Sequence, residues 1–103
     1  MLNNVLVYLR CISEADTFKI KINGDSMYPL LKSGQIVSVK KSSFYDINDI
    51  VVINRLDHFI VHRVIDILET DKTKYFLTKG DNNSFVDRWF AFKYIIGKVI
   101  DEN

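Results

Sequence analysis

The chain has 103 residues, of which 48% are hydrophobic and 26% charged, and its formal net charge is +1. This length accommodates one domain with a modest core, and the apolar share predicts an ordered globule rather than a disordered segment. No long run of Lys or Arg occurs. Because phosphate binding needs a concentrated basic surface, we expect no nucleic acid partner.

Cysteine and histidine usage argues against a metal centre. Cys11 is the only cysteine, which excludes an intrachain disulfide and a thiolate zinc site. His58 and His62 are spaced four residues apart on an expected strand, and this spacing holds two imidazole rings too far apart to share an ion. We therefore expect neither a metal nor another cofactor.

The sequence contains no apolar run near the roughly 20 residues that a membrane-spanning helix needs. Its first residues also lack the basic start and the long apolar stretch of a secretory signal. We therefore expect a cytoplasmic or peripherally membrane-associated protein without a transmembrane segment.

The chain opens with apolar residues at helical spacing. They are Leu2, Val5, Leu6, Leu9 and Ile12. This pattern predicts a short amphipathic helix over residues 1–15. The helix either packs on the body of the domain or docks a partner protein or a membrane export system, and the sequence leaves both uses open.

From Thr17 onward the pattern changes to that of β-strands. Phe18, Ile20 and Ile22 alternate with polar residues, which is typical of a half-buried strand. Residues 50–53 are apolar on both faces and belong in the interior of a sheet. Further strands are expected over residues 35–40, 59–68, 74–79 and 94–100, the last with a bulge at Gly97. Residues 81–93 are expected to form a loop. Its aromatic residues are expected in the core, with the lining of an apolar cleft for small side chains as the alternative for some of them; they are Phe85, Trp89, Phe90 and Phe92.

Many short strands separated by turn signals predict a mainly β fold. We expect a small coiled or partly closed β-sheet over residues 17–101, preceded by the short helix. With no internal repeat and no linker, residues 1–103 are predicted to form a single domain.

Three residues far apart in the sequence suggest nucleophilic chemistry. Ser26 follows a Gly-Asp turn, His62 lies in an alternating segment with Ile60 and Val64 on its face, and Asp87 ends a polar loop. A serine hydroxyl is a weak nucleophile unless a base takes its proton, and a neutral imidazole is a suitable base. A carboxylate on the far ring nitrogen fixes the tautomer and stabilises the imidazolium.

Residues around the serine are the expected oxyanion and substrate-binding positions. They are Gly24, Asp25, Met27 and Pro29. The backbone N–H of Ser26 is expected to face a developing oxyanion, where such a donor is worth roughly 3 to 4 kcal/mol. For Met27, packing in the core is the alternative to forming a wall of the substrate groove.

Four segments resemble the conserved boxes of type I signal peptidases. Gly24–Leu31 resembles the box that carries the nucleophile, and Asn48–Ile53 resembles the Gly-Asp-Val-Val strand with Asn48 in place of glycine. Val61–Val64 is similar to the box of the histidine-type branch, found in the endoplasmic reticulum, archaea and some sporulating bacteria. Thr78–Arg88 resembles the next box of that branch, and the likeness extends over about residues 18–100.

The resemblance implies a mainly β peptidase domain of the kind shared with LexA-type and phage repressors. By matching positions, it implies Ser26 as nucleophile, His62 as general base and Asp87 as the charge-stabilising acid, with Asp81 as a second supporting carboxylate. Each of these residues also has a purely structural interpretation. Ser26 and Asp81 could be turn residues, and His62 could be a structural histidine with its hydrogen bonds satisfied. Asp87 could pair with Arg88 or cap the aromatic loop.

Besides Asn48, the sequence departs from the family pattern at two points. No segment of it matches the family's membrane anchor, and Gly24 stands where many relatives carry a serine that adds an oxyanion donor. We therefore expect a serine endopeptidase that cleaves an extended leader or signal-type peptide, or a precursor protein, after a small residue. The alternative is a non-catalytic or self-processing repressor-like module used for binding, against which histidine in place of lysine and the absence of Ala-Gly and Cys-Gly bonds both count.

Overall fold

The computed structural model describes residues 17–101, which form a single antiparallel sheet. Its strands are β1 (Thr17–Lys21), β2 (Ile36–Lys40), β3 (Ile50–Arg55), β4 (His58–Glu69), β5 (Lys74–Lys79), β6 (Trp89–Ala91) and β7 (Ile95–Asp101), with a 3₁₀ turn η1 (Phe92–Tyr94) before the last. The order across the sheet is β1-β2-β7-β3-β4-β5-β6. The predicted mainly β class is confirmed, whereas the helix predicted over residues 1–15 and Cys11 lie outside the described residues.

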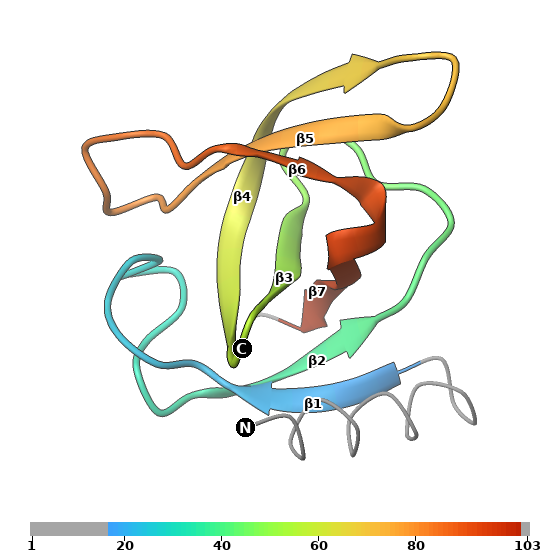
Figure 1. The fold of residues 1–103 in the computed structure, drawn as a ribbon. Helices are drawn as coiled ribbons and strands as arrows, with labels where there is room; N and C mark the ends of the chain where they lie inside the picture. Colours follow the sequence, from blue (N-terminus) through green and yellow to red (C-terminus); the bar gives the residue numbers. More distant parts are fainter. Residues whose placement is uncertain (1–16, 102–103) are drawn as a thin grey trace.

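The sheet coils strongly along its length. The long strand β4 runs from the level of β1 and β2 up to β5 and β6, so the two ends of the sheet lie at opposite sides of the molecule (Figure 1). Within residues 17–101, β1 and β6 each pair with one strand only, so hydrogen bonding does not close the sheet into a barrel. Nor does this part of the chain contain a helix with the length and apolar character needed to cross a bilayer.

Strand β3 is buried on both faces, as its continuous apolar sequence predicts. One face contributes Ile50 and Val52 to a cluster that also contains Met27 and Leu31. The other face contributes residues to a second cluster, whose buried members are Tyr45, Val51, Ile53, Val64, Phe76, Phe90 and Ile95. The coiled sheet thus encloses apolar side chains on both sides of its central strand.

The bulge predicted at Gly97 is present in β7. Val52 pairs with Gly97 and Ile53 with Ile95, so Ile96 is the extra residue. A Cβ on Gly97 would lie 2.6 Å from a methyl carbon of Val39, which means that this position must be glycine for β7 to approach β2 so closely.

The prediction of a loop over residues 81–93 was wrong at its C-terminal end. Trp89–Ala91 forms β6, which pairs with Tyr75–Leu77 of β5, and η1 follows. Three residues are too few to show the alternation that identifies a strand, and the pairing is imposed by the neighbouring strand.

The aromatic residues of this segment divide between core and surface. Phe90 is buried and Phe92 packs against the same cluster, as expected. Phe85 and Trp89 are 82% and 42% exposed, so their assignment to the core was wrong. Only Trp89 and Phe90 lie in β6, where consecutive side chains point to opposite faces, so Phe90 is buried and Trp89 is exposed.

Candidate functional site

The Ser26 turn is a compact excursion between β1 and β2. Gly24 enters it with a φ of +83°, a conformation that glycine adopts without strain. Inside the turn, the N–H of Tyr28 donates to the carbonyl of Asp25, and the N–H of Leu31 donates to that of Met27. Met27 and Leu31 are fully buried, so the turn is anchored in the core on one side while Ser26 remains half-buried at the surface.

His62 lies in β4 opposite Val51 of β3 and is only 8% exposed. Its neighbours on the same face, Ile60 and Val64, belong to or pack against the second apolar cluster. The alternating pattern around His62 predicts this arrangement. It surrounds the imidazole with apolar groups, which exclude water from most of the ring.

The three side chains expected to meet do meet. Ser26 Oγ lies 3.0 Å from His62 Nε2, and His62 Nδ1 lies 2.6 Å from Asp87 Oδ2. These residues are 36 and 25 positions apart in the sequence and come from the β1–β2 turn, β4 and the loop before β6. In the neutral imidazole with the proton on Nδ1, Asp87 accepts that N–H and Nε2 accepts the serine hydroxyl proton.

Thr78, a residue that sequence reasoning did not single out, orients Asp87. Its hydroxyl donates to Asp87 Oδ2 at 2.7 Å, and the backbone N–H of Asp87 donates to the carbonyl of Thr78 at 2.8 Å. Thr78 is fully buried in β5, directly opposite Val64 and so on the face of the sheet that carries His62. In the sequence, the only indication of this role is that Thr78 is a polar residue near the end of a largely apolar strand, at the start of the segment Thr78–Arg88.

The loop after β5 holds the Ser26 turn in place. The N–H of Asn82 donates to the carbonyl of Ser26 at 2.8 Å, and its side-chain Nδ2 donates to the carbonyl of Asp25 at 3.0 Å. Gly80 is buried, and a Cβ there would lie 2.8 Å from the Ser26 carbonyl oxygen. Gly80 and Asn82 therefore position the serine, which sequence reasoning also missed.

Asp81, expected as a second supporting carboxylate, contacts neither Ser26 nor His62 through a hydrogen bond within residues 17–101. It accepts two hydrogen bonds from Arg63, from Nε at 2.8 Å and from Nη2 at 2.7 Å. These bonds lower the pKa of the Asp81 carboxyl, with the positive charge of the guanidinium acting in the same direction. Its position in the loop is thereby fixed, and any influence on His62 acts through space.

The positions expected to bind the oxyanion or substrate differ in what they offer. The N–H of Gly24 donates to Ser33 Oγ at 3.1 Å and is therefore occupied. Met27 packs in the core, which was the alternative to its lining the substrate groove. Its sulfur accepts a hydrogen bond from the backbone N–H of Asp81. Pro29 is exposed and follows a cis peptide bond.

Three consecutive backbone N–H groups at the serine have no hydrogen-bond acceptor among the described residues. Within the described part of the chain, the N–H groups of Asp25, Ser26 and Met27 donate no hydrogen bond. The Ser26 N–H is thus free to donate to a bound group, and its role as an oxyanion donor stays a prediction.

His58 is separated from this constellation. Its Nδ1 lies 3.3 Å from Asp57 Oδ1, and both side chains are more than half exposed. Residues 17–101 contain no group of three or more His, Cys, Asp or Glu side chains placed to hold a metal ion.

Comparison with known proteins gives one match. A family model described as Peptidase S24-like matches residues 3–100, which is nearly the whole chain. No curated protein and no solved structure matches significantly. The match supports the superfamily of signal peptidases and LexA-type proteins, and hence a peptidase or LexA-like module. The chain belongs to the peptidase S24-like family.

Proposed function

We propose that the chain is a serine endopeptidase in which Ser26, His62 and Asp87 act as nucleophile, general base and orienting acid. The observation that carries this proposal is the continuous hydrogen-bonded path from Ser26 Oγ through the imidazole to Asp87, at 3.0 and 2.6 Å. The match to a peptidase family supports peptidase activity in general.

The geometry suits acyl transfer. His62 Nε2 accepts the hydroxyl proton as Ser26 Oγ bonds to the carbonyl carbon of the scissile peptide, and Asp87 stabilises the resulting imidazolium. The same Nε2 then donates the proton to the departing amine, which leaves an ester on Ser26. Water activated by His62 hydrolyses this ester and restores the serine.

Backbone groups supply the remaining stabilisation. The N–H of Ser26 is the proposed oxyanion donor, and the N–H of Asp25 is the candidate for a second. Gly24 provides no side-chain donor, and its own N–H is bonded to Ser33. One missing donor of this kind typically costs a factor of about 10² to 10³ in rate, so turnover is expected to be slow.

The substrate is proposed to bind as an added strand along β4. Pairing of β4 with β3 starts at His58, but pairing with β5 starts only at Arg63. Within residues 17–101, no strand pairs with the second edge of β4 over residues 60–62, and His62 lies at the end of that stretch. A peptide in extended conformation there would gain main-chain hydrogen bonds and present its carbonyl groups to Ser26.

The histidine in place of lysine favours the histidine-type branch of the signal peptidases. We propose a leader or signal-type peptide, or a precursor protein, as substrate, cut after a small residue. The helix predicted over residues 1–15 would bind the partner protein or membrane export system that delivers it.

A peptide library derived from a whole proteome tests the proposal without a known substrate. New amino termini, identified by mass spectrometry, should accumulate with the wild-type chain and be absent with Ser26→Ala and with His62→Ala. Ser38→Ala, which changes a serine of β2 outside the site, serves as the control and should leave cleavage intact. Cleavage that persists in both site variants would remove the peptidase assignment.

A binding module that processes only itself is the second candidate, because the matched family is also consistent with a LexA-like module. The two functions differ in an observable way. A self-processing chain converts to two fragments at a rate independent of its concentration and leaves the library intact, whereas the proposed endopeptidase cleaves the library and keeps its own mass.

A further inference from the structure

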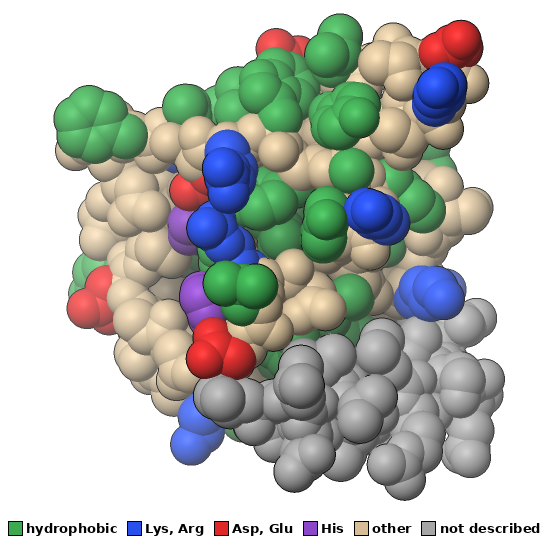
Figure 2. Space-filling view, viewed as in Figure 1, with side chains coloured by type: hydrophobic (Ala, Val, Ile, Leu, Met, Phe, Trp, Pro, Cys, Tyr) green, Lys and Arg blue, Asp and Glu red, His purple; other side chains and the backbone are tan. Residues whose placement is uncertain are grey.

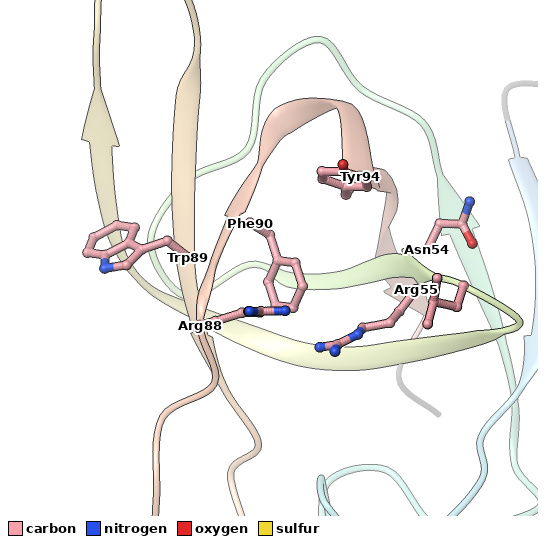
Figure 3. Close-up of a pocket in the computed structure, with 7 residues that line it drawn as sticks. Asn54, Arg55, Arg88, Trp89, Phe90 and Tyr94 are labelled. Carbon is pink, nitrogen blue, oxygen red and sulfur yellow. The ribbon is translucent and has the colours of Figure 1, made fainter.

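A pocket of about 480 Å³ lies between the β3–β4 hairpin and the start of β6. It is lined by Asn54, Arg55, Leu56, Arg88, Trp89, Phe90 and Tyr94. Figure 3 shows the side chains of Arg55 and Arg88 extending toward each other from the hairpin and from the segment before β6. Two cationic side chains therefore converge on a partly aromatic hollow.

The charge of this pocket is not balanced. No carboxylate is among its lining residues, and within residues 17–101 neither Arg55 nor Arg88 forms an ion pair or a hydrogen bond through its side chain. Lys93 does not line the pocket, but its Nζ lies 5.2 Å from the centre of the ring of Tyr94, which does. Like charges held together without a partner repel one another, so an anion entering the pocket would relieve a local cost.

Carboxylates close to the pocket in the sequence are already engaged. Asp87, which precedes Arg88, bonds His62 and Thr78, and Asp57, which follows Leu56, pairs with His58. Within residues 17–101, neither of these carboxylates forms an ion pair with Arg55 or Arg88. A guanidinium pair of this kind matches the two oxygens of a carboxylate.

The remaining lining suits a peptide. Trp89 and Tyr94 are 42% and 45% exposed, so their rings offer apolar area to a ligand. Asn54 also lines the pocket, and its side-chain oxygen is buried without a hydrogen-bond partner among the described residues. In Figure 2, cationic side chains border an area of hydrophobic side chains, a surface character that matches an acidic peptide with an apolar neighbour.

The position of the pocket relates it to the proposed catalytic site. Arg88 directly follows Asp87, and Arg55 pairs in register with His58, four residues before His62 on β4. Four residues of extended chain span roughly 13 Å. A peptide lying along β4 with its scissile bond at Ser26 would therefore place a residue about four positions away beside the two arginines.

We propose that this pocket is a specificity subsite that binds an acidic side chain of the substrate, about four residues from the scissile bond. Its place relative to that bond depends on the proposed peptidase function, but the preference of the pocket for a carboxylate does not. The acidic group increases the affinity for the substrate, while Ser26 and His62 act on the peptide bond.

Trp89 is the only tryptophan of the chain, so its fluorescence reports directly on the pocket. Short alanine–threonine peptides carrying one Glu, and matched peptides carrying Gln instead, are titrated into the full chain with Ser26→Ala, which blocks turnover. We expect a saturable change in fluorescence with the Glu peptide and at least about tenfold weaker binding of the Gln peptide, the size of one charge-assisted hydrogen bond.

Two substitutions test the guanidinium groups. Arg55→Gln and Arg88→Gln should each weaken binding of the Glu peptide about tenfold and leave binding of the Gln peptide unchanged. Lys72→Gln, which removes an exposed cation in the turn between β4 and β5, should change neither. Equal binding of the two peptides, no saturable binding of either, or unaltered affinity in both arginine variants would overturn the proposal.

Two further measurements separate this proposal from others. A single-stranded oligonucleotide that binds more tightly than the Glu peptide, with the same dependence on Arg55 and Arg88, would replace the peptide by a phosphate ligand and so refute the assignment. In the active chain, moving the Glu along a cleaved peptide should lower KM most at three to five residues from the cut. If no peptide is cleaved, the peptidase function fails, while the Trp89 titration still decides whether the pocket binds a carboxylate.

Discussion

The backbone N–H of Asn82 donates a hydrogen bond of 2.8 Å to the carbonyl oxygen of Ser26, across 56 positions of sequence. This bond attaches the loop after β5 to the turn that carries the serine. Because Gly80 has no side chain, the backbones of the loop and of the turn can approach each other this closely. The distance from Ser26 to His62 consequently depends on a residue that takes no part in proton transfer.

Replacing Gly80 by alanine should reduce activity more than stability. The new Cβ would lie 2.8 Å from the Ser26 carbonyl oxygen, so the turn must shift, and a displacement of about 1 Å lowers turnover by up to about 100-fold. Gly34→Ala is the matched control, because Gly34 has a φ of +90° but no atom within 4 Å of its virtual Cβ. Peptide cleavage per folded molecule and thermal unfolding distinguish the two, and equal activity losses in both variants would contradict the positioning role.

Removing the Thr78 hydroxyl should weaken the orientation of Asp87. Thr78→Val keeps the shape of the fully buried side chain but deletes its hydrogen bond to Asp87 Oδ2. A hydrogen bond to a charged group is worth about 1.5 to 3 kcal/mol, so we expect kcat to fall by at least about tenfold with KM nearly unchanged.

Two controls accompany the Thr78 variant. Thr78→Ser retains a hydroxyl and should recover most of the lost rate. Thr73→Val, in the turn before β5, should leave kcat unaltered. A rate for Thr78→Val equal to wild type would show that Asp87 is held without this bond.

Acid stability should depend on Asp81. Because hydrogen bonding from Arg63 lowers the folded-state pKa of this carboxyl, the unfolded chain binds the proton first as the pH falls. The stabilisation is therefore fully present above about pH 4 and is lost as the pH falls through the lowered folded-state pKa.

Denaturant unfolding measured from pH 7 to pH 2 tests this dependence. Asp81→Asn should be less stable than wild type at neutral pH, and the difference should close in the acid range. Asp71→Asn changes the same charge in the exposed turn between β4 and β5 and should not alter the slope. A difference between wild type and Asp81→Asn that stays constant down to pH 2 would be inconsistent with the Arg63 interaction.

The sequence predicts those parts of the fold that local periodicity encodes. Alternation identifies β1, and an apolar run on both faces identifies β3 as an interior strand. Strand β6 was not predicted from the sequence. Its three residues are too few to show an alternating pattern, and they form a strand because they pair with β5. The exposure of Trp89 has the same origin, whereas Phe85 lies in the loop before β6 and nothing in its local sequence marks it as exposed.

The proximity of Ser26, His62 and Asp87 was expected from their local contexts, but the residues that hold them were not. Thr78 acts through its hydroxyl and its backbone carbonyl, and Asn82 through its backbone N–H and its side-chain amide, and such groups are too common in any chain to be singled out. The partner of Asp81 was also missed, because Arg63 takes the face of β4 opposite to His62 and only the folded loop brings the two together.

The most direct measurement is whether the serine and the histidine act as one unit. Single-turnover cleavage of a peptide identified from the library is compared among wild type, Ser26→Ala, His62→Ala and the double variant. Because one proton-transfer step needs both groups, each single change should lower the rate by roughly 10³-fold or more, and the double variant should be no slower than either. Losses that multiply in the double variant, or wild-type rates in either single variant, would contradict the account.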